Sequence, residues 1–285
     1  MMNKMMNLNE LVKKSYNIRK DVINMLARAG SGHLGGSLGM ADIFTVLYFS
    51  ELRHDPNNPK WDLRDRLVLS NGHVAPVWYA TLSNAGYFPK EELFTLRQFG
   101  SRLQGHPSRL NGLPGIESSS GSLGQGLSIA LGMAISAKYL NKSYRIFCLM
   151  GDGEMQEGNI WEAIMAAGHY QLDNLLAIVD RNKLQIDGDT EQVMALEPLK
   201  EKIIYFNWNV LECNGNDISS LLECLQLISW SQKPTFIIAH TTMGKGVKSI
   251  ENNHLWHGKA PNMDEAQKFL IELDEYYKEK YKLLS

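Results

Sequence analysis

Short apolar runs bounded by polar or glycine residues predict the strands of this chain. Each run has the length expected of a buried strand, and the runs cover residues 66–69, 146–150, 175–179, 209–213 and 235–239. Between the second and third runs, apolar residues recur at helical spacing over residues 160–167. Strand, crossover helix and strand in this order predict a doubly wound α/β fold with a mostly parallel sheet flanked by helices.

Amphipathic patterns predict helices around this sheet. They cover residues 8–28, 40–49, 79–85, 127–139, 218–228 and 264–284. Asp217 is the expected N-cap of the fifth of these helices. Residues 99–114 read as a loop and residues 193–202 as an exposed connection. Because no second set of strands follows, residues 1–285 are predicted to form a single domain.

Composition excludes several classes of function. The chain has 285 residues, 44% hydrophobic residues, and 29 Lys and Arg against 31 Asp and Glu, so neither a nucleic-acid surface nor a membrane surface is expected. Cys148, Cys213 and Cys224 lack metal-binding spacing, and their odd number suits reduced thiols in a cytoplasm. The first residues lack the apolar region of a signal peptide, and no apolar run is long enough to cross a bilayer. We therefore expect a cytoplasmic protein.

Polar residues follow two of the predicted strands. Asp152 follows the strand at 146–150 and Asn182 follows the strand at 175–179, and ligands of parallel sheets bind outside such carboxyl ends. Carboxylate, amide and carbonyl oxygens suit Mg²⁺ or Ca²⁺, so Asp152, Asn182 and the main-chain oxygen of Leu184 are candidate ligands that leave room for a diphosphate. Taken alone, GDG is more often a tight turn, and Asn182 is then a loop residue. GDGEMQEG followed by DRNKLQIDG at this spacing is a far more specific signal than GDG alone.

Histidines occur in four segments that end strands or contain glycine. His33 lies between glycines before a helix, where a ligand contact is favoured over a capping role. His73 follows the strand at 66–69 and should face the same edge of the sheet. His106 in GHP is read equally well as a surface-turn residue, and His257 lies in WHG, whereas we interpret His254 as structural.

A serine- and glycine-rich segment precedes another predicted helix. Residues 118–126 read SSSGSLGQG and lead into the helix at 127–139. The N-terminus of a helix that follows such a loop suits an anion, although this signal is weak when taken alone.

Taken together, these motifs resemble the thiamine-diphosphate enzymes of the transketolase family. GDGEMQEGNIWEA and DRNKLQIDG resemble the two halves of the family's cofactor signature. The other segments that carry the resemblance are SGHLGG, SNGH, GHP, SSSGSLGQG and WHG. Leu34 and Ser122 stand where the family commonly has proline.

The resemblance implies a role for each matching residue. Asp152, Asn182 and the carbonyl of Leu184 would bind Mg²⁺ or Ca²⁺ and so bridge the diphosphate. The residues implied at the cofactor are His73, Gly121, Ser122, Leu123, Gly151, Asp152, Gly153, Glu154, Asn182 and His257. The residues implied at the sugar are His33, His106 and His257. Glu157 would belong to an acidic chain between paired active sites, and it also suits the first turn of a helix.

The resemblance covers nearly all of the chain but only the first, diphosphate-binding (PP) domain of the family. The glutamate that acts on the pyrimidine ring comes from a second domain on the facing subunit, and no such domain follows here. The resemblance therefore implies the N-terminal subunit of a split transketolase, paired in an α2β2 heterotetramer with a C-terminal, pyrimidine-binding subunit. Such an enzyme transfers a two-carbon ketol unit from a ketose phosphate to an aldose phosphate, as in the pentose phosphate pathway.

Other functions remain open at this point. One is another thiamine-diphosphate enzyme component, of the deoxyxylulose-phosphate synthase or 2-oxoacid dehydrogenase type. A second is a transketolase for an unusual sugar or a sulfosugar. A third, of a different class, is a non-catalytic diphosphate-binding subunit that stabilises or regulates a partner. The GSGH, GHP and LGQG segments favour transketolase.

Overall fold

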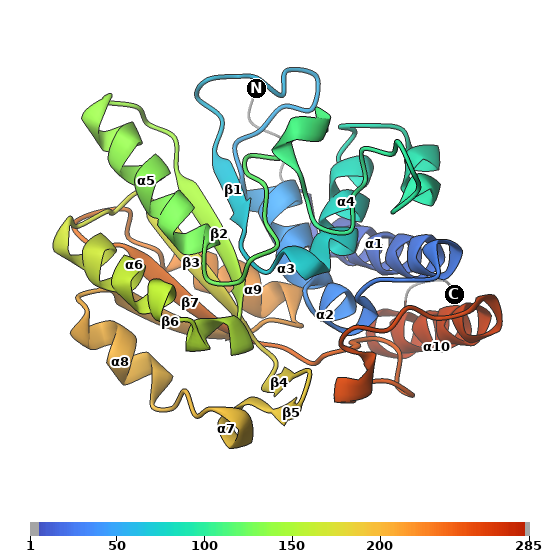
Figure 1. Ribbon diagram of the computed structural model, residues 1–285. Coiled ribbons are helices and arrows are strands. Elements are labelled where there is room, and N and C mark those ends of the chain that lie inside the picture. The colour runs from blue at the N-terminus through green and yellow to red at the C-terminus, as the bar shows by residue number, and fades with distance from the viewer. Residues whose placement is uncertain (1–5, 283–285) are drawn as a thin grey trace.

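A five-stranded parallel sheet forms the centre of the computed structural model, which describes residues 6–282 (Figure 1). Its strand order is β1-β2-β3-β7-β6, and every neighbouring pair is parallel. The strands are β1 (Arg66–Leu69), β2 (Ile146–Gly151), β3 (Leu175–Arg181), β7 (Thr235–His240) and β6 (Asn209–Asn214). A two-stranded antiparallel hairpin, β4 (Leu184–Gln185) with β5 (Gly188–Asp189), follows β3.

Helices cover both faces of the sheet. The longer ones are α1 (Leu8–Ala29), α4 (Ala75–Asn84), α5 (Gly126–Tyr139), α6 (Gly158–His169), α9 (Ile218–Gln226) and α10 (Met263–Tyr281). The short ones are α2 (Leu34–Gly39), α3 (Ala41–Val46), α7 (Thr190–Val193) and α8 (Leu199–Tyr205). A π-helical segment, η1 (Leu47–Glu51), follows α3, and the short 3-10 helices are η2 (Gly72–Val74), η3 (Lys90–Thr95), η4 (Arg109–Asn111), η5 (Gly153–Gln156) and η6 (His254–Trp256).

Successive side chains of each strand point to opposite faces of the sheet, so the buried side chains form two cores. Leu67 and Leu69 of β1 pack with residues of α1, α3, α4, α9 and α10, whereas Val68 packs with residues of α5, α6 and α8. Figure 1 shows α5, α6 and α8 together on one side of the sheet and α1 beside α10 on the other. Helices on both faces confirm the predicted α/β class.

Most predicted elements are confirmed, with shifts at their ends. All five strands form, and β3 continues two residues beyond its prediction, to Arg181. Asp217 caps α9 by accepting a hydrogen bond from the amide of Ser220. The C-terminal helix begins at Met263 and ends at Tyr281, and residues 283–284 of that prediction lie outside the described residues.

Two sequence-based helix boundaries were wrong. Helical structure begins at Leu34, inside the glycine segment, because Leu34 and Leu38 are buried and their packing outweighs the low helix propensity of glycine. The helix predicted at 79–85 begins at Ala75, since a proline near a helix start costs no hydrogen bond. Residues 193–202 do include the exposed connection that the sequence predicts, and α8 begins at its end with the buried Leu199.

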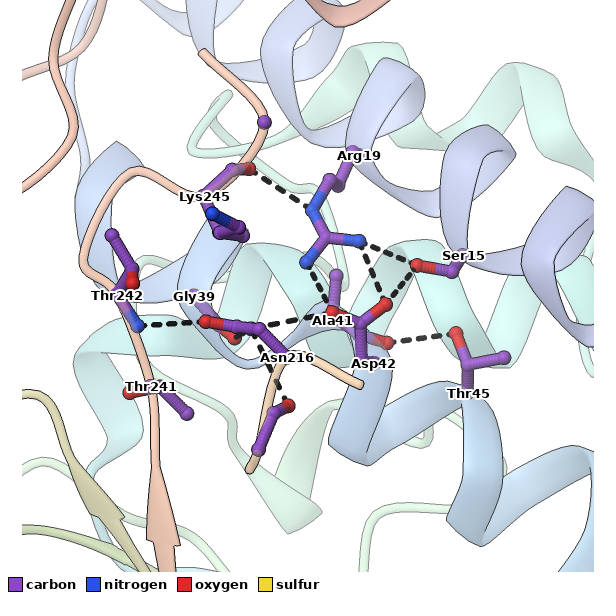
Figure 2. Close-up of polar contacts among 12 residues, drawn as sticks. Ser15, Arg19, Gly39, Ala41, Asp42, Thr45, Asn216, Thr241, Thr242 and Lys245 are labelled. Atoms are coloured by element: carbon purple, nitrogen blue, oxygen red, sulfur yellow. Dashed lines mark hydrogen bonds and ion pairs between the residues drawn. The ribbon is translucent and has the colours of Figure 1, made fainter. Parts of the chain in front are cut away.

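A buried ion pair that the sequence did not predict joins several of these elements. Arg19 of α1 donates to Asp42 of α3 at 3.0 and 2.7 Å, and its Nε donates to the carbonyl of Lys245 at 3.1 Å (Figure 2). Asn216, in the turn before α9, donates to Asp42 at 3.2 Å and accepts from the amide of Thr242 at 2.7 Å. This Arg19–Asp42 network therefore fixes the loop after β7 against α1 and α3.

Within residues 6–282, no helix is both long enough and apolar enough to cross a membrane.

Candidate active site

Four histidines from distant parts of the sequence meet in the structure. His33 precedes α2, His73 lies in η2 after β1, His106 lies in the loop before η4, and His257 follows η6. The ring centroid of His33 lies 5.1 Å from that of His73, 6.3 Å from that of His106 and 5.8 Å from that of His257. The centroids of His73 and His257 are 5.0 Å apart. The sequence predicted all four at the site, and the structure brings them together as one histidine cluster.

Close packing between two loops helps to place this cluster. A side chain at Gly72 would not fit, because a Cβ atom there would lie 2.4 Å from Oγ of Ser120. The serine and glycine segment before α5 can therefore press against the turn that carries His73. Gly121 of the same segment also lies against the ring of His106, with its Cβ position 3.7 Å from the Cγ atom of that ring.

All four imidazoles have a lowered pKa, which favours their neutral form at neutral pH. Burial, and then the neighbouring His257, Arg97 and His106, lower the pKa of His33 to about 4. Burial and the three other histidines lower the pKa of His73 well below its usual value of 6.5. Burial alone lowers the pKa of His257, and burial together with Arg97 lowers that of His106.

Several polar atoms around the cluster lack a partner within the described part of the chain. They include Nδ1 of His33, Nδ1 of His257, Oδ1 of Asn71 and Oγ of Ser120, all of which are buried. Buried polar atoms are nearly always hydrogen-bonded in a complete structure. This group is therefore suited to a polar ligand.

The predicted metal ligands also lie together, at the ends of β2 and β3. The buried carboxylate of Asp152 accepts hydrogen bonds from Arg181 at 2.9 Å and from the amide of Lys183 at 2.7 Å. The amide nitrogen of Asn182 donates to Asp180 at 2.9 Å, and its oxygen accepts from the amide of Leu184 at 2.9 Å. These bonds set the orientation of both candidate side chains.

The chemistry of these groups fits a hard divalent cation that shares its coordination with a ligand. Among residues 6–282, no cluster of three or more His, Cys, Asp or Glu side chains is arranged to hold a metal. The predicted set instead combines one carboxylate, one amide and one carbonyl, so oxygens from elsewhere must complete it. A cavity of about 450 Å³ opens beside it, lined by Arg181, Asn182, Lys183, Leu184, Asp189, His240, Thr241, Thr242 and Asn252.

Glu154 and Glu157 lie in contrasting surroundings. The buried carboxylate of Glu154 accepts hydrogen bonds from the hydroxyl of Ser70 and from the amides of Gly124, at 2.8 Å, and Gly151, at 3.1 Å. Glu154 therefore joins the ends of β1 and β2 to the loop before α5. Glu157 is exposed and packs beside Gly124 at the start of α6.

The remaining predicted cofactor residues lie in the loops around these two groups. Gly151 ends β2, and Gly153 begins η5 immediately after Asp152. Ser122 and Leu123 are exposed in the loop before α5. The predicted metal and diphosphate residues Asp152, Gly153 and Asn182 therefore follow the carboxyl ends of β2 and β3, and Glu157 is exposed.

Sequence reasoning missed three residues here. Asp180 is buried at the end of β3, and burial, with Asp152 as a further cause, raises its pKa to about 7. Arg181 is buried beside it and pairs with Asp152, Glu191 and Glu197. The available signal for Asp180 and Arg181 was their charge, because they directly follow the apolar run at 175–179. Arg97 gave no such signal, because it lies outside every motif and element that the sequence predicts.

Comparison with known proteins identifies the class of this fold and site. Residues 12–281 match the family described as "Transketolase, thiamine diphosphate binding domain". The chain belongs to this family. The prediction of a transketolase-type enzyme subunit with a thiamine-diphosphate-binding domain is thereby confirmed.

Two relatives match this chain over most of their own length. It is 42% identical over 271 residues to a subunit of apulose-4-phosphate transketolase from Phocaeicola vulgatus, covering 95% of this chain and 96% of the relative. It is 42% identical over 241 residues to 6-deoxy-6-sulfo-D-fructose transketolase subunit SqwG of a Clostridium species, covering 84% and 87%. Both relatives are named as subunits, in agreement with the predicted split arrangement.

Single-chain transketolases match over less than half of their length. The human enzyme is 36% identical over 269 residues, covering 94% of this chain and 42% of the relative. A crystal structure of transketolase from Campylobacter jejuni has a TM-score of 0.88 and 35% identity, covering 94% of this chain and 43% of that one. The chain therefore corresponds to one part of these longer enzymes.

Proposed function

We propose that this chain is the diphosphate-binding half of a split transketolase that moves a two-carbon ketol unit from a ketose phosphate to an aldose phosphate. The observation that carries the proposal is the convergence of four histidines, together with Asp152 and Asn182 at the carboxyl ends of the neighbouring strands β2 and β3. Their ring centroids lie between 5.0 and 6.3 Å apart, although the residues come from four separate segments. A single domain over residues 1–285 would hold them all.

In this proposal the cofactor is thiamine diphosphate with Mg²⁺ or Ca²⁺. Asp152, Asn182 and the carbonyl of Leu184 would hold the metal against the diphosphate, since hard cations prefer such oxygens. The loop residues proposed to contact the cofactor are His73, Gly121, Ser122, Leu123, Gly151, Gly153, Glu154 and His257. When bound, the cofactor supplies a nucleophilic carbon that also serves as an electron sink.

The histidines would act on the sugar through neutral imidazoles. A neutral imidazole both donates and accepts a hydrogen bond, so it can orient a hydroxyl group or move a proton. Burial lowers the pKa values of His33, His106 and His257, which keeps these rings neutral at the pH of a cytoplasm. We assign His33, His106 and His257 to the substrate.

A second chain would complete the site. No residue described here is assigned to the pyrimidine ring, and we propose that a C-terminal subunit provides that contact in an α2β2 assembly. Ile129, Ile135 and Met165 are exposed on α5 and α6, which suits burial against another chain, because obligate interfaces are apolar. The exposed Glu157 begins α6 beside them and would link the paired sites.

Reconstitution tests this proposal. We expect the purified chain alone to be inactive and the mixture with its C-terminal partner to transfer ketol units, with thiamine diphosphate and Mg²⁺ or Ca²⁺ present. Ketol transfer by this chain without a partner would contradict the split arrangement. Decarboxylation of a 2-oxoacid by the mixture, in place of ketol transfer, would indicate a different thiamine-diphosphate enzyme. Cofactor binding without any turnover would indicate a non-catalytic subunit.

The names of two relatives favour an unusual sugar as substrate. One relative is named for apulose 4-phosphate and the other for 6-deoxy-6-sulfo-D-fructose. We therefore propose a phosphorylated or sulfonated sugar outside the ordinary pentose phosphates. Assays with each sugar, in parallel with a pentose phosphate donor, separate these substrates by their kcat/KM.

A further inference from the structure

Arg97 lies beside the histidine cluster but belongs to neither the proposed metal site nor the proposed cofactor site. It follows η3, and its backbone has a left-handed conformation with a φ of 60°. Its amide donates to the carbonyl of Leu103 at 2.9 Å, which closes a short loop. The position from which its side chain starts is therefore fixed by the backbone.

The guanidinium lies between the two loops that carry His33 and His106. A Cβ atom at Gly105, the residue before His106, would lie 2.7 Å from Cζ of Arg97. The Cβ position of Gly32, the residue before His33, is 3.7 Å from Nε of Arg97. Arg97 thus lies next to the segments that carry two proposed substrate contacts, and Gly105 has no side chain that would displace it.

No hydrogen bond or ion pair is formed by this guanidinium within residues 6–282. Arg102, a few residues further on, has an ordinary structural arrangement, because it donates to both oxygens of Glu92 at 2.8 Å. Arg97 is exposed and has no such carboxylate. Its charge acts on the site, since after burial it contributes to lowering the pKa values of His33 and His106.

We propose that Arg97 binds the anionic end group of the sugar, a phosphate or a sulfonate, and that His33 and His106 meet the uncharged part of the same molecule. This inference rests on the proposed function. The planar fork of a guanidinium matches the oxygens of such groups and donates two parallel hydrogen bonds. Arg97 would add a contact from this chain to those expected from the partner subunit.

The test compares donors that differ only in charge. The complex of this chain with its C-terminal partner is assayed with a phosphorylated ketose, its sulfonated counterpart, and the same ketose with a hydroxyl at that position. Arg97→Gln should raise KM for an anionic donor roughly 10- to 100-fold, the loss expected for hydrogen bonds to a charged group, with kcat nearly unchanged. The neutral donor should show little change, and Arg97→Lys should fall between. The anionic donor with the larger loss identifies the natural end group.

Arg109→Gln is the matched control, because Arg109 is also exposed in this segment but is not among the charges named as lowering the pKa values of His33 and His106. It should behave as the wild type with all donors. Equal losses on charged and neutral donors would overturn the proposal and show that Arg97 only holds the two loops. Unchanged kinetics in Arg97→Gln would overturn it as well.

A second measurement separates failure of this inference from failure of the proposed function. If the wild-type complex turns over none of the sugars, the proposed function is wrong, and anion binding is then tested directly with inorganic phosphate. Its titration into the isolated chain is followed through the imidazole NMR signals of His33 and His106. Saturable shifts that Arg97→Gln abolishes would support the proposal. Shifts that are equal in both proteins, or absent from both, would overturn it.

Discussion

The Arg19–Asp42 network and the histidine cluster are both regions of polar side chains inside an α/β fold, yet they are built differently. In the network, Arg19 and Asp42 are 1% and 4% exposed, and each charge is paired within the chain. In the cluster, Nδ1 of His33 and Nδ1 of His257 are buried without a partner in the described residues. The network is complete as it stands, whereas the cluster has unused hydrogen-bonding capacity.

Electrostatics shows the same difference. Burial opposes charge in both regions, but in the network the ion pair outweighs it, so the pKa of Arg19 is raised and that of Asp42 is lowered. In the cluster nothing offsets burial, and the pKa values of all four histidines fall. Charge is thus held where it ties helices together, whereas the four imidazoles are kept neutral where a substrate is proposed to bind. We expect mutations in the network to affect stability and mutations in the site to affect function.

The largest effect should come from breaking the network. Asp42→Ala leaves the buried guanidinium of Arg19 without its counter-ion, and it should lower the free energy of unfolding by about 3–5 kcal/mol. Urea denaturation followed by circular dichroism measures this loss. The double variant Arg19→Met with Asp42→Leu should lose less unfolding free energy than Asp42→Ala, because an apolar pair replaces both charges. A loss below about 1 kcal/mol in Asp42→Ala would contradict the comparison.

In the site, Asp152→Ala should instead leave the fold nearly unchanged and remove the linkage between metal and cofactor. Arg181 keeps its ion pairs with Glu191 and Glu197, so no buried cation loses its last partner. Metal-dependent affinity for thiamine diphosphate should fall at least about 100-fold, because a direct ligand is lost. Calorimetric titration of the complex measures the affinity. Unchanged affinity would remove Asp152 from the proposed metal site.

The difference between the two regions also explains what the sequence could predict. The strands follow from short apolar runs, and the rule that ligands bind at strand ends placed Asp152, Asn182 and His73 together. The family resemblance added His33, His106 and His257. The Arg19–Asp42 pair has no such signal, because its contacts join residues separated by tens to hundreds of positions without any periodicity. Arg97 was missed because no motif and no predicted element includes it.

A smaller effect is expected at His106, which is exposed at the edge of the cluster. His106→Ala should lower kcat/KM by the factor that corresponds to a loss of about 1.5–3 kcal/mol in transition-state stabilisation. This is the range for one hydrogen bond to a charged group. The affinity for thiamine diphosphate should stay close to wild type, because we assign this ring to the sugar. Steady-state kinetics and calorimetry on the same preparation separate these two effects. Wild-type kinetics would exclude a role for His106 in catalysis.

The effect that is smallest at neutral pH concerns stability at acidic pH, through His33. Burial and neighbouring positive charge lower its pKa in the folded chain to about 4 from the usual 6.5. As the pH falls below 6.5, the unfolded chain therefore takes up a proton that the folded chain does not, and the free energy of unfolding decreases. The contribution is fully present above pH 6.5, and its loss is complete below about pH 4. His33→Gln should make the pH dependence of urea unfolding flatter within this window. Equal slopes in the wild type and His33→Gln would show that this ring is not held neutral by the fold.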